Sequence, residues 1–474
     1  MPPEVEPTPK SQTAKTGKAA QLKQKFKSLG KQKKIVVVGV AAVLAILLTV
    51  GIVAILTHGD GTRGSYYGST NSGDGSGVRT GASDSQQEGE KRASQFATDP
   101  TERGKYLSLN NCSGTGSKKL GSAPMKSADI GVILPYGLTA GGHVTPVDHQ
   151  YYFGKNASAS PSTYDVLSPG DGTLVSVEVR PRSAGTYDVR GVISYSCTFF
   201  SYFDLANTLS ADVDAKMPAD WKTINGPQAV SIPVKQGQVI AKVGGQSLDF
   251  AVWDTTKSLK GLLVPAAYNN YEPWKINTVR PTDYFTDTVK STVLPFYART
   301  VEPRDGTFDH DIDGTASGNW FKAGTNGYIG AFKESDFNPQ VYADGHLSLA
   351  PDLYDPSGWI FSTGAVKHGT QYAIKAPSIT PDKLTPQSGM VKYELLPVEH
   401  VDQTGAKWFA GSVPTSLKLD TTGTATQGTA LVQMNAKREL KVEIVLNERP
   451  SQVSGFTSAA AIYTRGDEAK SMAR

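Results

Sequence analysis

The run FDHDIDGTASGNW has residue types that can bind a cation. Asp309, Asp311, Asp313 and Gly314 follow the spacing of the first half of a calcium-binding loop. Such a loop needs a bidentate Glu at its twelfth position, where this chain has Trp320. The flanking residues also have the composition of strands rather than helices. The run is therefore predicted to be an acidic, solvated hairpin.

A second segment, GGHVTPVDHQYYF, brings His143, Asp148 and His149 close together in the sequence. Imidazole and carboxylate groups can bind zinc or transfer protons. The same residues also suit structural roles, because His143 can cap a turn and Asp148-His149 can form a buried hydrogen-bonded pair. The sequence has no Gly-x-Ser-x-Gly, phosphate-binding loop, dinucleotide fingerprint or Cys-x-x-Cys.

Residues 35–57 form an uncharged apolar run, IVVVGVAAVLAILLTVGIVAILT. As a helix it would reach about 34 Å, enough for a hydrocarbon core of about 30 Å. A secretory signal peptide has a shorter apolar core and a small-residue cleavage site, and neither fits this run. We therefore expect a single transmembrane helix.

Residues 1–34 contain nine Lys and two Glu, which places this tail in the cytoplasm by the positive-inside rule. Contact with anionic lipid explains its charge, so the expected partner is the bilayer rather than nucleic acid. The tail contributes +7 to an overall charge of +4, which leaves −3 on the remaining chain. The bulk of the protein is expected outside the cell membrane.

Residues 58–104 are rich in Gly, Ser, Asp and Thr and are predicted to be a disordered linker. Beyond it lie Cys112 and Cys197. In an oxidising compartment they can form one disulfide, although two buried free thiols fit the sequence as well.

From about Lys105 onward, short runs rich in Val, Ile, Tyr, Phe and Thr alternate with turn residues. This pattern predicts a mostly β fold. The expected domains are 105–285, a β domain at 286–392 and a β-rich C-terminal region at 393–474. The last region either completes the second domain or forms a third.

The first domain contains two similar strand–turn–strand units, VLSPGDGTLVSV (166–177) and VKQGQVIAKVGG (234–245). Such units recur in barrel-sandwich hybrid folds, including lipoyl and biotinyl carriers. Those carriers need a modifiable Lys at a hairpin tip, and no Lys here has that setting. We therefore expect no carried prosthetic group.

Residues 131–285, which include these two units, resemble the lysostaphin-type zinc metallopeptidases, also called the LytM or duplicated-hybrid-motif family. The counterparts of the family's motifs occur in the family's order, as GGHVTPVDHQYYF (141–153), VLSPGDGTL (166–174), SYFDL (201–205), VKQGQVIAKVG (234–244) and SLDFAV (247–252). The resemblance implies a barrel-sandwich hybrid domain, joined to one or two further β domains and tethered to a membrane helix.

Family members bind zinc through a His-x-x-x-Asp segment and the last His of a His-x-His strand. The resemblance implies His143, Asp148 or His149, and Asp249 as the metal ligands of this chain. The first offset is five residues instead of four, and an Asp replaces the last His. If His143 or His149 lies within about 5 Å of Asp249, the ligands are close enough for a metal site.

Two further family histidines polarise water or stabilise the oxyanion, and Asp204 and Ser247 occupy their places here. Extra carboxylates would weaken the Lewis acidity of a bound metal. The first hypothesis is a non-catalytic envelope protein without a cofactor, which binds cell-wall glycopeptide or a partner envelope protein. The alternative is a zinc-dependent endopeptidase that acts on peptidoglycan cross-links or surface proteins. A purely structural surface protein is a third possibility.

Overall fold

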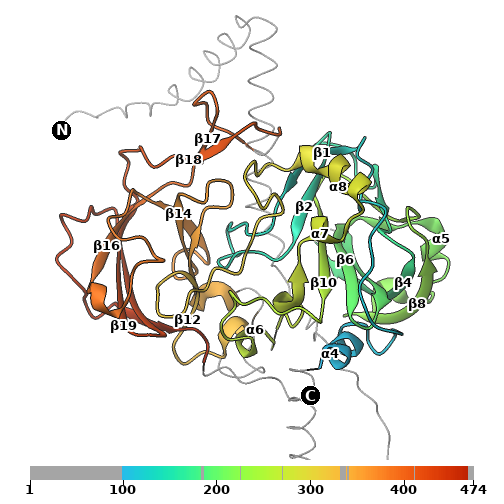
Figure 1. Cartoon of the computed structure of the whole chain (residues 1–474), viewed down its shortest axis with the longest axis horizontal. Coiled ribbons are helices and arrows are strands. Elements are labelled where there is room, and N and C mark those ends of the chain that lie inside the picture. The colour runs from blue at the N-terminus through green and yellow to red at the C-terminus, as the bar shows by residue number, and fades with distance from the viewer. Residues whose placement is uncertain are drawn as a thin grey trace, which may run out of the picture. The chain divides into compact units, whose positions relative to one another are not determined.

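The computed structural model describes residues 99–182, 186–224, 226–269, 271–330, 338, 341–409 and 412–467 (Figure 1). The predicted tail and the predicted membrane helix lie outside these residues, as does most of the predicted linker. Within the part of the chain that is described, no helix is long and apolar enough to cross a membrane. This part is mostly β-structure, as the sequence predicts.

Helix α4 (Pro100–Leu107) begins inside the segment predicted as linker. The carboxylate of Asp99 accepts hydrogen bonds from the backbone N–H groups of Thr101 (2.8 Å) and Glu102 (3.3 Å). Pro100 takes the first helical position, where a backbone N–H has no partner within the helix. The prediction of disorder is therefore wrong for residues 99–104, because an Asp cap followed by Pro starts a helix.

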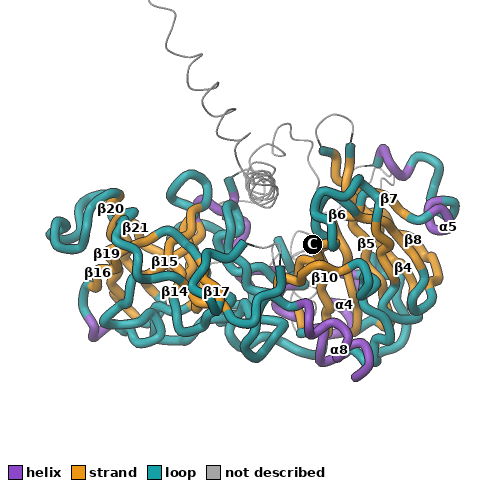
Figure 2. The backbone as a smooth tube through the Cα atoms, turned by 90° about the horizontal axis from the view of Figure 1, so that it is seen from above, coloured by secondary structure: helices purple, strands orange, loops and turns teal. Residues whose placement is uncertain are grey.

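The first domain is built on an eight-stranded antiparallel sheet with the order β1-β2-β10-β6-β5-β4-β8, and β11 also pairs with β10. Figure 2 shows the part of this sheet from β10 to β8. Its strands are β1 (Ile130–Leu134), β2 (Gln150–Gly154), β4 (Gly172–Pro181), β5 (Tyr187–Ser196), β6 (Phe199–Ala206), β8 (Gln228–Val234), β10 (Leu248–Asp254) and β11 (Thr278–Val279). Edge strand β8 alternates buried and exposed residues, whereas every residue of β10 is buried. Both faces of the sheet are therefore covered by protein at β10.

A smaller sheet with the order β3-β9-β7 packs on one face. Its strands are β3 (Tyr164–Leu167), β9 (Val239–Val243) and β7 (Thr208–Leu209). The two predicted strand–turn–strand units meet at their turns, where Ser168 and Gly237 share a backbone hydrogen bond of 2.8 Å. Asp171 also accepts a hydrogen bond from the backbone N–H of Gln236 (2.9 Å). The two units therefore support each other.

Apolar side chains of both sheets form one buried core that includes Val166, Ile240, Phe203 and Phe250. The other face of the large sheet carries a second cluster, with Tyr202, Trp253 and Trp274. Four short helices connect the strands or follow them: α5 (Ala211–Asp214), α6 (Ala266–Asn269), α7 (Pro281–Tyr284) and α8 (Asp287–Val293).

The C-terminal half forms a closed barrel in the order β12-β13-β14-β15-β16-β19-β20-β21. Its strands are β12 (Gly318–Lys322), β13 (His346–Pro351), β14 (Trp359–Thr363), β15 (Thr370–Ile374), β16 (Val391–Leu396), β19 (Gly428–Ala436), β20 (Glu439–Leu446) and β21 (Ala461–Thr464). A separate hairpin joins β17 (His400–Asp402) to β18 (Leu417–Leu419). The barrel takes strands from both sides of residue 392, so the C-terminal region completes it.

The acidic run before the barrel ties the two halves together. Asp311 is buried and accepts hydrogen bonds from the backbone N–H groups of Leu263 (3.0 Å) and Asn319 (2.6 Å). The guanidinium of buried Arg465 lies 3.0 Å from the same carboxylate. The prediction of a solvated hairpin is therefore wrong at Asp311, because distant partners satisfy this carboxylate.

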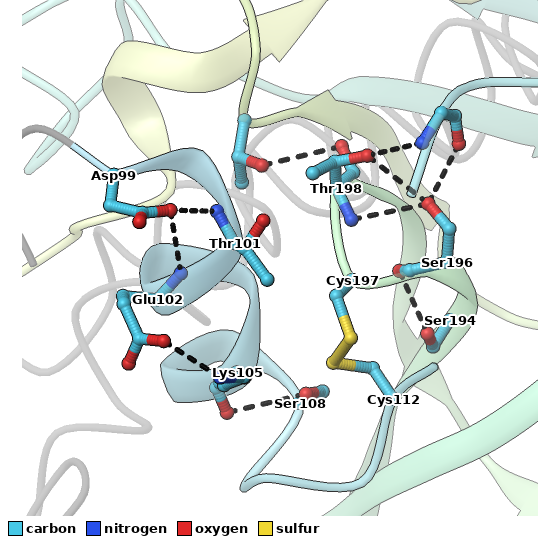
Figure 3. The surroundings of a disulfide bond; sticks show 12 residues. Asp99, Thr101, Glu102, Lys105, Ser108, Cys112, Ser194, Ser196, Cys197 and Thr198 are labelled. Atoms are coloured by element: carbon cyan, nitrogen blue, oxygen red, sulfur yellow. Dashed lines mark hydrogen bonds and ion pairs between the residues drawn. A yellow bond between two sulfur atoms is a disulfide. The ribbon is translucent and has the colours of Figure 1, made fainter. Parts of the chain in front are cut away.

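Cys112 and Cys197 form a disulfide that links the segment after α4 to the turn between β5 and β6 (Figure 3). The two Cα atoms are 5.0 Å apart, across a sequence separation of 85 residues. Of the two possibilities that the sequence left open, the structure shows the disulfide. By closing a long loop, it reduces the conformational entropy of the unfolded chain.

We predict that the Cys112→Ser/Cys197→Ser variant loses about 2–4 kcal/mol of unfolding free energy. Urea denaturation of the oxidised protein and of the variant measures the difference. Reduction with dithiothreitol should lower the wild-type midpoint to that of the variant and leave the variant unchanged. Alkylation of both cysteines in denatured, unreduced protein would contradict the disulfide.

Candidate functional site

A row of polar side chains crosses five neighbouring strands on one face of the large sheet. Asp249 on β10 lies directly opposite Tyr151 on β2 and Asp204 on β6. Arg190 on β5 lies directly opposite Glu178 on β4. Directly opposed residues share a face of the sheet. We call these five residues the polar row.

The imidazole of His149, the residue before β2, lies between two buried carboxylates. Its Nδ1 is 3.5 Å from Oδ1 of Asp148, and its Nε2 is 3.5 Å from Oδ2 of Asp249. Nε2 also hydrogen-bonds the hydroxyl of Tyr151 at 2.9 Å. The two ring nitrogens point in different directions. The ring therefore bridges Asp148 and Asp249, and the two carboxylates do not converge on one point.

Asp148 is neutralised by a buried cation from a distant segment. The ammonium of Lys275, only 1% exposed, lies 3.4 Å from Asp148 and 3.1 Å from Glu272. Burial alone would raise the pKa of Asp148, but Lys275 and His149 outweigh it and hold that pKa below its usual range. Asp148 therefore stays ionised, and Lys275 holds its carboxylate in place.

At Asp249 the effect of burial on the pKa outweighs that of the neighbouring charges. Burial raises its pKa to about 6, against the lowering effects of His149, Arg180 and Arg190. Its Oδ1 is buried and has no hydrogen-bond partner among the described residues. Removing a carboxylate from water favours its neutral form, so Asp249 gains a proton more readily than an exposed aspartate does.

Two arginines neutralise Asp204, the residue in place of a family histidine. Arg180 on β4 forms an ion pair with Oδ2, and the Nε of Arg190 lies 3.5 Å from the same oxygen. The guanidinium of Arg190 also lies 4.9 Å from the ring centroids of Tyr202 and Trp274. These aromatic contacts add cation–π attraction and hold Arg190 over the sheet.

The remaining predicted residues lie at the margin of the row. His143 is exposed in a turn with Ala140, and its ring centroid is 6.1 Å from that of His149. Gln371 of the barrel forms two hydrogen bonds with the backbone of Gly141, at 2.9 and 3.0 Å, and so holds this turn. Ser247 is buried just before β10. The structure therefore brings His149 close to Asp148 and Asp249, and leaves His143 and Ser247 beside them.

The residues do not fit a zinc site. His149 and Asp249 satisfy the expected distance, but Asp148 lies at the other nitrogen of the same ring. A tetrahedral site needs three ligands that converge on one point. No group of three His, Cys, Asp or Glu side chains with that property occurs in the described part of the chain. The absence of a cofactor nevertheless stays a prediction.

Sequence reasoning missed the cations of the site. Arg180 and Arg190 interrupt apolar strands, and a charge inside such a strand is a sign of a paired group. That sign was available in the sequence. Lys275 had no comparable signal, because its partner Asp148 lies 127 residues away.

No protein-family model matches this chain. No curated protein matches it either. Among solved structures, the chain is similar to the NMR solution structure of lysostaphin, with 13% sequence identity and a TM-score of 0.23. The alignment covers 64% of this chain and 100% of that one. At this identity and TM-score, the likeness supports no conclusion about the site.

Lys275→Met is predicted to lower the unfolding free energy by about 3–5 kcal/mol, because it leaves buried Asp148 without its cation. In Lys275→Met/Asp148→Asn the uncompensated charge is gone, so the double variant should lose less than the sum of the single losses. Urea denaturation of the wild type, Lys275→Met, Asp148→Asn and the double variant gives the coupling free energy between Lys275 and Asp148. The exposed Lys257→Met is the matched control and should change stability by less than about 0.5 kcal/mol. Additive single losses would contradict a direct interaction.

A pH series tests Asp249. Because its folded pKa of about 6 exceeds its unfolded value of about 4, the folded state holds the extra proton between these pH values. The wild type should therefore lose about 2–3 kcal/mol of unfolding free energy as the pH rises from 4 to 7, relative to Asp249→Asn. The exposed Asp212→Asn controls for general charge effects. If the difference in unfolding free energy between the wild type and Asp249→Asn stays constant from pH 4 to 7, the carboxyl of Asp249 has an ordinary pKa.

Proposed function

We propose that this chain is a membrane-anchored cell-envelope protein with a non-catalytic, lysostaphin-type domain that binds the cell wall. The domain at residues 105–285 is then a barrel-sandwich hybrid, supported by two strand–turn–strand units that hydrogen-bond at their turns. Residues 35–57 provide the anchor, and the polar segment after it provides reach into the envelope. The barrel is then a second extracytoplasmic domain.

The observation that carries the non-catalytic proposal is the internal neutralisation of Asp148, Asp204 and Asp249. Metal-assisted hydrolysis needs a cation with an open position for water. Here each acid of the site faces a side chain of this chain: Lys275 at Asp148, His149 at Asp249, and two arginines at Asp204. A divalent cation would have to displace these groups or lie beside positive charge.

The position of the row also favours binding or scaffolding over hydrolysis. Asp148, Asp204 and Asp249 are all buried, and Trp274 covers Arg190. A scissile peptide bond must reach its catalytic groups to within hydrogen-bond distance. A ligand would therefore contact the rim of the site, near exposed His143, rather than the buried acids.

The test uses the full-length protein in detergent with isolated peptidoglycan. We expect the protein to sediment with the peptidoglycan, to release no soluble fragments from it, and to retain no stoichiometric zinc after gel filtration. His149→Ala should behave like the wild type in all three assays. The exposed His368→Ala is the matched control for loss of a histidine.

Stoichiometric zinc and released cross-link fragments, both lost in His149→Ala and retained in His368→Ala, would establish the zinc endopeptidase instead. Protein that stays in the supernatant would contradict cell-wall binding.

A further inference from the structure

A hollow between the first domain and the barrel is independent of the polar row. Its cavity volume is about 70 Å³. Backbone and side chains of residues 137–139 form one wall, and the barrel and the β17 strand form the other. Residues that line it include Leu138, Thr139, Leu353, Tyr354, Val398 and His400. A mostly apolar lining at a domain junction, with few polar groups, is typical of small-molecule sites.

The polar side chains that line this hollow are those of Thr139, Asp352 and His400, and the imidazole of His400 is oriented by Asp352. Nε2 of His400 lies 2.9 Å from Oδ2 of Asp352, and both side chains are largely buried. The other carboxylate oxygen of Asp352 accepts hydrogen bonds from the backbone N–H groups of Tyr354 (3.0 Å) and Asp355 (2.7 Å). Asp352 therefore has partners at both oxygens, and it fixes the ring of His400.

This arrangement determines what His400 offers to a ligand. Because Nε2 donates its proton to a carboxylate, the neutral ring has no proton on Nδ1, which is then an acceptor. Within the described residues Nδ1 makes no hydrogen bond. A ligand with an O–H or N–H group can therefore donate a hydrogen bond to that nitrogen.

The surrounding contacts make the hollow rigid. The rings of His400 and Tyr354 form a T-shaped pair with centroids 5.0 Å apart, and the Tyr354 ring also packs on Trp408 at 5.2 Å. Buried Arg299 donates hydrogen bonds to the carbonyl oxygens of Leu353 and of Pro303 (2.8 Å). These contacts join segments that are far apart in the sequence, so little ordering is needed when a ligand binds.

We propose that this hollow binds a small, uncharged molecule with an apolar body and a hydroxyl group. The apolar body contacts Leu138, Leu353 and Val398, and the hydroxyl donates to Nδ1 of His400. An anion is disfavoured by the neighbouring carboxylate of Asp352. A cation would have to compete with the proton donors that Asp352 already binds, which are His400 and the backbone N–H groups of Tyr354 and Asp355.

The test is protein-observed methyl NMR of the full chain, labelled at Leu and Val, with cyclohexanol and methoxycyclohexane as matched probes. Both probes have the same ring, but only cyclohexanol donates a hydrogen bond. We expect cyclohexanol to shift the methyl signals of Leu138, Leu353 and Val398 saturably. Methoxycyclohexane should bind about tenfold more weakly, which is the value of about one hydrogen bond.

His400→Phe removes the acceptor and should make the two probes bind with equal affinity. The exposed His368→Phe should leave the ratio of the two affinities unchanged. Leu138→Trp fills the hollow and should abolish both sets of shifts, which tests the site without disturbing Asp352. Equal binding of both probes to the wild type, no saturable shifts, or shifts located at the polar row would overturn the proposal.

Discussion

Two buried carboxylates, Asp204 and Asp249, lie directly opposite each other on neighbouring strands, and the charges around them follow from that pairing. Like charges opposed across a sheet repel, and burial adds the cost of removing each charge from water. The structure offsets this cost with arginines at Asp204 and an imidazole at Asp249, and part of it remains as the raised pKa of Asp249. The site is thus built to stabilise its own acids.

The need for counter-charges also connects the two halves of the protein. Lys275 neutralises Asp148 from the segment between β10 and β11, and its ammonium lies 5.0 Å from the ring centroid of Tyr328, which lies between the barrel's first two strands. Gln371 holds the turn that contains His143. The barrel therefore takes part in positioning the site, and changes there are expected to reach the polar row.

The sequence predicted the strands well, because the alternation of apolar and turn residues is a local signal. It also placed Asp204 and Asp249 on strands, but not opposite each other, since a slip of one residue would move either side chain to the other face. The cations were missed because the partners of Arg180, Arg190 and Lys275 come close to them only in the tertiary fold. The same limit applies to Asp311, whose exposure was predicted from local composition and whose partners are distant.

The most direct test of the central claim is the nitrogen NMR spectrum of the His149 ring, with and without added zinc. If the ring connects Asp148 to Asp249 and Tyr151, its two nitrogen signals should keep their positions when zinc is added, and Asp249→Asn should shift Nε2 more than Nδ1. A zinc-dependent shift of one ring nitrogen at stoichiometric metal would contradict the account, because it would show that the acids of the polar row are available as ligands.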